Sequence, residues 1–196
     1  MLEQGNTRKL NVGCGRNALA GWINLDFMPL PGVDIVADLD ACDSEPLPID
    51  DDSTDEFLLS HVLEHIRKPL PLMQELYRIA RPDALCVVRC PHGASDDAWT
   101  DPTHLRPYYH GSFGYFSQPY YWRADYGYRG DWQPRTITLA VEGERFADVA
   151  ATEIFSRMQT ERNVVREMIV ELVAVKPIRE PKRELQRQPK LAFTMV

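Results

Sequence analysis

Short apolar runs alternate with polar turns along the first half of the chain. Between the fourth and fifth runs, Leu70, Met73 and Leu76 recur at helical spacing, which predicts a helix over residues 69–80 that ends before Pro82. Runs that alternate with helices in this way predict βαβ units, and so a doubly wound, mostly parallel, Rossmann-like α/β sheet. The predicted strands cover residues 8–13, 21–26, 33–37, 57–60 and 85–88.

The second half of the chain is less regular. Residues 92–135 interrupt the alternation with a loop-rich insertion, in which residues 108–132 hold eleven of the chain's nineteen aromatic residues. Long insertions of this kind are often lids or binding loops. Further strands are predicted over residues 137–141, 151–157 and 164–175, and the charged segment from 177 to 190 is predicted to be flexible. We therefore expect one domain over residues 1–176 and a charged tail over 177–196.

Composition narrows the classes of function. The net charge of −7 argues against a nucleic-acid partner, because phosphate binding leaves a basic footprint. The four cysteines form no CxxC pair, so neither a zinc knuckle nor a disulfide framework is indicated. No apolar run approaches the length of about 18 residues needed for a membrane span, and the start at residues 1–4 is unlike a signal peptide. We expect a cytoplasmic protein without a membrane span.

A glycine turn carries the main functional signal. The strand that begins at Leu10 runs into Gly13-Cys14-Gly15, and the next apolar run ends in the carboxylate of Asp26. This arrangement forms a nucleotide-type pocket at the carboxyl edge of a parallel sheet. The glycines also fit the G-x-G-x-x-G/A dinucleotide pattern, which needs a following helix and an acid about 20 residues later. Only residues 16–21 separate the turn from the next strand, and this spacing disfavours a nicotinamide or flavin cofactor.

S-adenosylmethionine fits the same spacing better, because it has no phosphate that needs a helix N-terminus. Glycines let its methionine end approach the backbone. Its ribose hydroxyls need an acceptor such as the Asp26 carboxylate, and Asp38 is suited to accept from the adenine amino group with Leu39 against the ring.

Taken together in order, these motifs resemble class I S-adenosylmethionine-dependent methyltransferases over about residues 9–91. The resemblance implies a sheet of about seven strands with the last one antiparallel, S-adenosylmethionine as cofactor and S-adenosylhomocysteine as product. Two departures are the shortened first helix and Asp83-Ala84 in place of the usual Gly-Gly turn. The matching motifs are LNVGCG at 10–15, GWINLD at 21–26, ADL at 37–39, LP at 47–48, DE at 55–56, SHVLEHI at 60–66, ELYRIARP at 75–82 and DPTHLRP at 101–107.

The resemblance and the local pattern together assign candidate site residues. The catalytic candidates are His104, which Asp101 is expected to orient, and His61, because a hydroxyl or amine acceptor needs a base near neutral pH. The substrate-binding candidates are Arg106, which suits an anionic group, and Tyr108. The residues expected to bind the cofactor are Asn11, Gly13, Cys14, Gly15, Asp26, Asp38, Leu39, Ser60 and His61.

Structural interpretations remain open beside these roles. His104 suits a hydrogen-bonded cluster that staples a loop, and His61 suits the start of a helix. His61 and His65 are spaced so that they could share a helix face, but the sequence supplies no third ligand, so no metal site is predicted.

The aromatic insertion has three interpretations: a second small core, a surface that stacks on a planar or sugar-like acceptor, or the contact surface of a homodimer. Because the first helix is short, the insertion or a partner subunit is expected to cover the cofactor. The sequence thus predicts a methyltransferase that acts on an oxygen or nitrogen of a small-molecule substrate such as a sugar or glycan precursor. The alternatives are a non-catalytic S-adenosylmethionine-binding module and a nicotinamide-dependent oxidoreductase.

Overall fold

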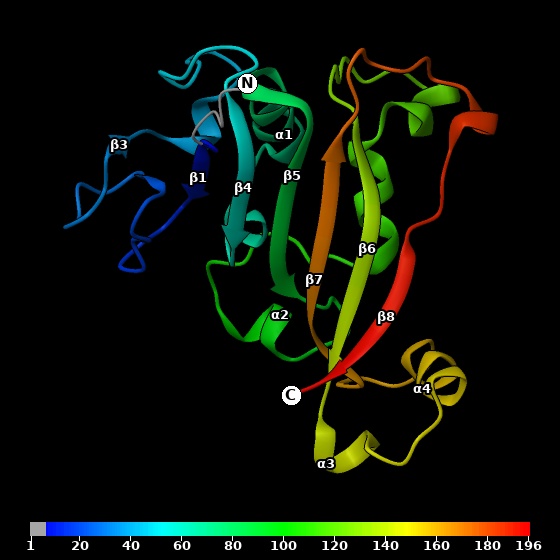
Figure 1. The fold of residues 1–196 in the computed structure, drawn as a ribbon. Helices are drawn as coiled ribbons and strands as arrows, with labels where there is room; N and C mark the ends of the chain where they lie inside the picture. The colour runs from blue at the N-terminus through cyan, green and yellow to red at the C-terminus, as the bar shows by residue number, and fades with distance from the viewer. Residues whose placement is uncertain (1–6) are drawn as a thin grey trace, which may run out of the picture.

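The chain folds around one twisted sheet in the order β3-β2-β1-β4-β5-β7-β6-β8 (Figure 1). The computed structural model describes residues 7–196, so the start of the chain at residues 1–4 lies outside the described part. Strands β1 to β5 pair in parallel, whereas β7 is antiparallel to both β5 and β6. The strands are β1 (Lys9–Val12), β2 (Ile23–Asp26), β3 (Ile35–Val36), β4 (Thr54–Ser60), β5 (Ala80–Pro91), β6 (Trp132–Val141), β7 (Val165–Ala174) and β8 (Lys190–Met195).

The predicted Rossmann-like, mostly parallel sheet is confirmed; its antiparallel strand is β7, and β8, the last strand, is parallel to β6. The first helix, predicted to be shortened, is replaced by turns, and no helix separates β1 from β2 among the described residues. The α-helices are α1 (Pro69–Ile79), α2 (Asp97–Thr100), α3 (Gly143–Phe146) and α4 (Ala151–Met158). The 3-10 helices are η1 (Leu39–Ala41), η2 (Leu63–His65), η3 (His110–Phe116), η4 (Gln118–Trp122) and η5 (Arg183–Leu185). None of the helices within residues 7–196 is long and apolar enough to cross a membrane.

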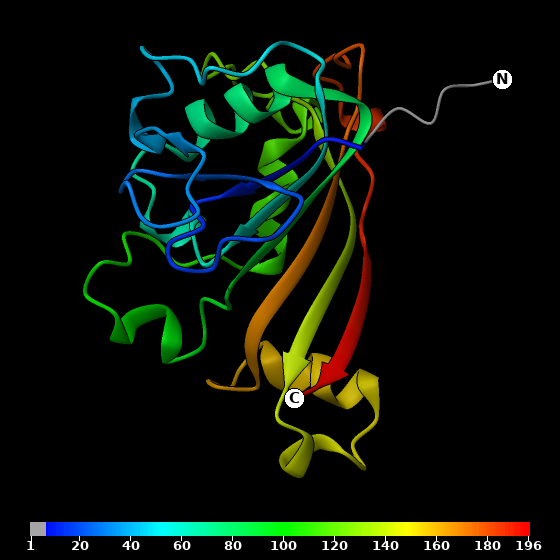
Figure 2. The same ribbon diagram turned by 60° about the vertical axis from the view of Figure 1, so that its left-hand side comes forward.

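Two predictions for the second half were wrong. The strand predicted over residues 151–157 is the helix α4, in which Ile154 and Met158 are buried one helical turn apart. The predicted flexible tail instead ends in β8, which lies beside β6 along the long edge of the sheet (Figure 2). Helices α3 and α4 lie at the far end of these long strands (Figure 2).

Trp132 connects the two halves of the core. It lies at the start of β6 and is fully buried, and its indole Nε1 donates to the carbonyl oxygen of Met73 in α1 at 2.8 Å. Its ring meets Phe57 of β4 edge to face, with the centroids 5.6 Å apart. These contacts fix α1 against the sheet and so hold the loops at the carboxyl ends of β1, β2 and β4 in place.

Candidate functional site

A cavity of about 600 Å³ opens where β1, β2 and β4 end, as expected for the carboxyl edge of a parallel sheet. Five of the residues predicted to bind the cofactor line it: Gly13, Asp26, Asp38, Leu39 and His61. The remaining lining residues are Phe27, Asp40, Val62, His65, Ile66, Arg67 and Thr103.

The glycine turn needs its glycines. Gly13 and Gly15 have φ angles of +65° and +52°, in the left-handed region that other residues rarely adopt. A Cβ atom on Gly13 would lie 2.7 Å from Cγ2 of Val62, so a side chain at this position would clash. Gly13 and Val62 both line the cavity.

Asp26 links this turn to the end of β2. Its Oδ2 accepts from the amide of Gly15 at 2.7 Å, and its Oδ1 accepts from the amide of Met28 at 3.0 Å. The side chain is buried but lines the cavity. A carboxylate oxygen can accept two hydrogen bonds, so each oxygen can accept one more. The carboxylate can therefore accept from two hydroxyl groups.

Two other residues predicted to bind the cofactor, Asn11 and Cys14, are buried and do not line the cavity. Asn11 is buried and donates to the carbonyl oxygen of Asn17 and to Oδ1 of Asn24, both at 3.0 Å. Cys14 is also buried, and burial, followed by the nearby Asp26, raises the pKa of its thiol. Asn11, Cys14, Gly15 and Ser60 lie outside the set that lines the cavity.

Asp38 and Asp40 form the acidic side of the cavity. Asp38 caps η1 by accepting from the amide of Asp40 at 2.9 Å. Asp40 accepts from the amides of Arg67 and Lys68 at 2.7 and 3.2 Å, which ties η1 to the start of α1. The sequence prediction missed Asp40, although it follows the Ala-Asp-Leu motif directly.

His61 lies at the cavity wall between two carboxylates. Its Nε2 is 2.9 Å from Oε1 of Glu167, and its Nδ1 is 3.3 Å from Oε1 of Glu64. The close contact with the Glu64 carboxylate raises the pKa of His61, with a further contribution from Glu167. Glu167 comes from β7, 106 residues along the chain, so no local pattern pointed to it.

His104 lies away from the cavity. Its Nδ1 is 3.1 Å from the carbonyl oxygen of Ala98, and its ring packs edge to face with His65 at 4.7 Å between centroids. The nearest carboxylate oxygen of Asp101 is 4.0 Å from His104 Nε2, so Asp101 does not orient the ring through a direct hydrogen bond. Asp101 instead accepts from the amide and hydroxyl of Thr103, and the hydrogen bonds lower the pKa of this carboxyl.

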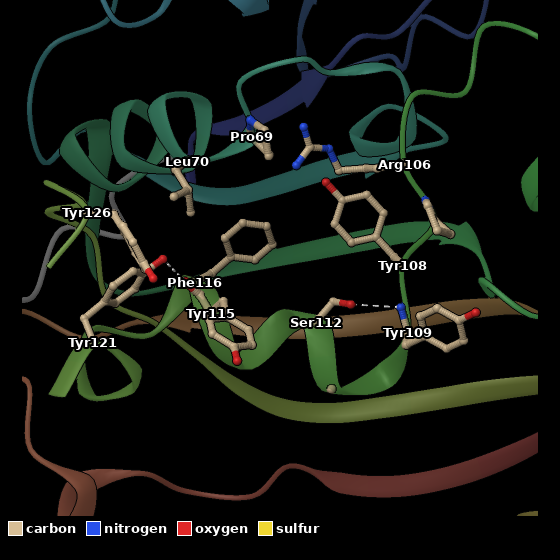
Figure 3. A pocket seen from close by; sticks show the side chains of 12 residues that line it. Pro69, Leu70, Arg106, Tyr108, Tyr109, Ser112, Tyr115, Phe116, Tyr121 and Tyr126 are labelled. Carbon is tan, nitrogen blue, oxygen red and sulfur yellow. Dashed lines mark hydrogen bonds between the residues drawn. The ribbon is translucent and has the colours of Figure 1, made fainter. Parts of the chain in front are cut away.

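The aromatic insertion lines a second cavity, of about 730 Å³ (Figure 3). Arg106 and Tyr108, the predicted substrate residues, both line it. Arg106 donates to the carbonyl oxygen of Arg67 at 2.9 Å and Tyr108 to that of Leu63 at 3.3 Å, so both are tied to the wall of the first cavity. The other lining residues are Pro69, Leu70, Pro107, Tyr109, Gly111, Ser112, Tyr115, Phe116, Tyr121 and Tyr126.

The aromatic residues divide between two roles. Phe113, Phe116 and Tyr121 are buried and belong to the main hydrophobic core, so they do not form a second core, whereas Tyr115 and Tyr126 expose 57% and 74% of their surface. Of residues 92–135, only Thr103 lines the first cavity. The aromatic rings of the insertion therefore line the second cavity and do not line the first cavity.

Comparisons with known proteins agree with this geometry. Residues 10–88 match the family model described as a methyltransferase domain. Comparison with the curated proteins found no match. Among solved structures, a SAM-dependent methyltransferase from Archaeoglobus fulgidus is similar, with 17% identity, a TM-score of 0.60 and 86% of each chain covered.

Two further structures share the fold. The complex between the Haloferax volcanii Trm112 methyltransferase activator and the putative methyltransferase matches at 15% identity and a TM-score of 0.55, covering 87% of this chain and 82% of the other. A putative methyltransferase from Bacillus halodurans matches at 14% identity and a TM-score of 0.55, covering 87% and 93%. At these identities the likeness is one of fold.

Proposed function

We propose that this chain is an S-adenosylmethionine-dependent methyltransferase that transfers a methyl group to an oxygen or nitrogen atom of a small, ring-containing, anionic substrate. The match of residues 10–88 to a methyltransferase domain supports this proposal, in which S-adenosylmethionine is the methyl donor. The observation that carries the proposal is the buried Asp26 carboxylate, held against a positive-φ glycine turn and open to a cavity at the end of β2.

In our proposal the methionine end of the cofactor lies against Gly13, where no side chain intervenes. The ribose hydroxyls donate to Asp26, and charge-assisted hydrogen bonds of this kind contribute roughly 1.5–3 kcal/mol each. The adenine lies between Asp38 and Leu39, with the carboxylate as acceptor for the amino group.

We assign the role of base to His61, because it lines the cofactor cavity whereas His104 lines neither cavity. The base must be unprotonated to accept the acceptor's proton. Because its pKa is raised, activity should increase with pH through a midpoint above the ordinary histidine value. The Glu167→Gln variant removes one of the carboxylates that raise this pKa, so its midpoint should move to lower pH.

The second cavity is proposed as the acceptor site. Its volume lies within the usual range for small-molecule pockets, roughly 300–1,000 Å³. Exposed tyrosine rings suit stacking on a sugar-like ring, and Arg106 suits a carboxylate or phosphate. Residues 66–67 and 103 line the first cavity, whereas residues 69–70 and 106–107 line the second, so neighbouring stretches of the same two segments face the two cavities. In our proposal the acceptor extends past these segments from the second cavity toward the first.

Formation of S-adenosylhomocysteine tests this proposal. The protein would be incubated with S-adenosylmethionine and a panel of neutral sugars, sugar phosphates and nucleotide sugars. Turnover with a phosphorylated member is expected, together with a KM raised at least about tenfold in Arg106→Ala, which corresponds to a lost contact of about 1.4 kcal/mol. Arg123→Ala, in the same insertion but outside the cavity lining, is the matched control and should leave KM unchanged.

Two results would count against the proposal. Tight binding of S-adenosylhomocysteine without turnover on any acceptor would favour a non-catalytic binding module. If Arg106→Ala turns over a phosphorylated substrate as fast as the wild type does, the second cavity is not the site for an anionic acceptor.

A further inference from the structure

Three side chains that could ligate a metal converge behind the wall of the cofactor cavity. Glu64 and His65 are consecutive residues of η2, and His104 comes from the insertion. Their ligand atoms all lie within 4.8 Å of one another. The amide of Leu105 donates to the carbonyl oxygen of Glu64 at 2.7 Å, so the two segments are joined beside the cluster. We propose that Glu64, His65 and His104 bind a divalent metal ion such as Zn²⁺, and Zn²⁺ is the ion used to test the site.

Glu64 gives the strongest reason for a cation. Its side chain is only 2% exposed, yet neither carboxylate oxygen accepts a hydrogen bond. His61 Nδ1 lies 3.3 Å from Oε1, but this ring is half exposed and is also hydrogen-bonded to Glu167. A buried carboxylate that accepts no hydrogen bond and has one titratable imidazole beside it is poorly compensated, and a bound cation would stabilise it.

Both imidazoles are oriented so that Nε2 is left free to bind the ion. His104 Nδ1 faces the carbonyl oxygen of Ala98 at 3.1 Å; because a carbonyl only accepts, Nδ1 carries the proton. His65 Nδ1 faces Oγ1 of Thr103 at 3.0 Å, and this hydroxyl already donates to Asp101 at 2.6 Å. The hydroxyl oxygen therefore accepts from His65 Nδ1–H, which leaves Nε2 of His65 with its lone pair.

The Ala98 carbonyl oxygen and the Thr103 hydroxyl, which bond to the Nδ1 atoms, are typical hydrogen-bond partners of metal-bound histidines. Such histidines donate their second ring N–H to a carbonyl, a carboxylate or a polar relay, which fixes the tautomer and the ring. The proposal gives Thr103 and Asp101 a role as positioning residues, which neither the cofactor nor the acceptor requires of them. Oδ1 of Asp101 accepts from the amide and the hydroxyl of Thr103, while its Oδ2 lies 4.0 Å from His104 Nε2.

The ligand set indicates the type of ion. Two imidazoles and one carboxylate suit Zn²⁺ and other first-row divalent ions, and they leave coordination positions open. Bond lengths of about 2.0–2.2 Å require the three donor atoms to surround the ion more closely than a spacing of up to 4.8 Å allows, so the proposal includes a rearrangement of these side chains on binding. His65 and Thr103 also line the cofactor cavity, so the ion would lie at its wall.

Calorimetry with Zn²⁺ alone tests the site on full-length protein that has been stripped with a chelator. We expect one equivalent to bind to the wild type, and the affinity to fall at least tenfold in His104→Ala and in Glu64→Gln. Thr103→Val should weaken binding by about 10- to 100-fold, as loss of an outer partner does. His110→Ala, outside the cluster, is the matched control and should bind as the wild type does.

Substitution with Co²⁺ gives a second readout, because the visible spectrum of a coordinated ion should change in Glu64→Gln and stay unchanged in His110→Ala. Failure to bind one equivalent, or equal affinity in wild type, His104→Ala and Glu64→Gln, would overturn the proposal. Because Zn²⁺ binding needs no methyl donor, this result is independent of the proposed function. Thermal unfolding of the same variants confirms that they are folded.

Discussion

Gly13 shows how strongly one position constrains the site. A methyl group there would meet Val62 at 2.7 Å, and the φ of +65° is already unfavourable for a residue with a side chain. We expect Gly13→Ala to lower the free energy of unfolding by about 1–3 kcal/mol and to weaken S-adenosylhomocysteine binding. Chemical denaturation and calorimetry measure the two effects.

The control for this substitution is Gly111→Ala. Gly111 has open space around an added Cβ and is not among the positive-φ glycines. Its replacement should change stability by less than about 1 kcal/mol. If both variants lose the same stability, the clash with Val62 does not explain the need for glycine in the turn.

His92 gives the protein a specific sensitivity to acid. Its side chain is 2% exposed, and burial, followed by the nearby His110, lowers its pKa to about 4. In the unfolded chain the same group titrates near the ordinary value of about 6.5, so the unfolded state binds more protons below that pH. Stability is therefore complete above about pH 6.5 and is lost as the pH falls toward 4, by up to about 3 kcal/mol.

His92→Asn should flatten this dependence, because Asn does not titrate but can still accept from the amide of Ala94. Urea unfolding between pH 4 and 6.5 measures the slope. An unchanged slope in the variant would assign the acid sensitivity to other groups.

The sequence could group residues of local motifs into one candidate site, but it could not include residues brought in from a distance. Gly13, Asp26, Asp38 and Leu39 lie at the ends of three predicted strands and line one cavity, and their contacts with a cofactor stay a prediction. Glu167 reaches His61 from the other half of the chain, and this pairing depends on the antiparallel register of β7 against β5. The sequence pointed to Asp101 but not to its hydrogen-bond partner Thr103, because a loop has no periodic pattern from which contacts can be predicted.

At the scale of elements, the strands with strong apolar runs were predicted well, and the failures have physical causes. The segment of α4 has only a few apolar residues, so its helical spacing was hard to separate from a strand. Strand β8 follows a charged segment and is only half buried at the edge of the sheet, so composition alone favoured a flexible tail. Its position depends on pairing with β6, more than fifty residues earlier.

Arg179 fastens the segment that leads to β8. It donates to both carboxylate oxygens of Asp131 at 2.7 Å, and Asp131 is fully buried. Removing one partner of a buried pair leaves an uncompensated charge, so Arg179→Ala should lower the free energy of unfolding by about 3 kcal/mol or more. Thermal and urea unfolding measure this loss.

Arg135→Ala is the matched control, since its pair with Glu171 is largely exposed and worth at most about 1 kcal/mol. Equal losses in the two variants would show that the Asp131 pair does not fasten this segment.

At the scale of the whole molecule, the chain combines a methyltransferase-type sheet with an insertion that lines most of the second cavity. Residues 10–88 carry the match to the methyltransferase domain and all the residues that line the first cavity except Thr103. Residues 92–135 add aromatic side chains to the core, most of the residues that line the second cavity, and His104. The sequence predicted the presence of this insertion and three roles for it, but which rings are buried depends on contacts with η3, η4 and β6 that no short motif encodes.

The central claim is that this chain binds S-adenosylmethionine through Asp26, and calorimetry with S-adenosylhomocysteine tests it most directly. We predict binding to the wild type, at least about tenfold weaker binding to Asp26→Asn, and unchanged binding to Asp34→Asn, whose carboxylate accepts from Asn24 outside the cavity. Titration with NAD should give no heat. Heat with NAD and none with S-adenosylhomocysteine, or equal affinity in the wild type and a folded Asp26→Asn variant, would contradict the account.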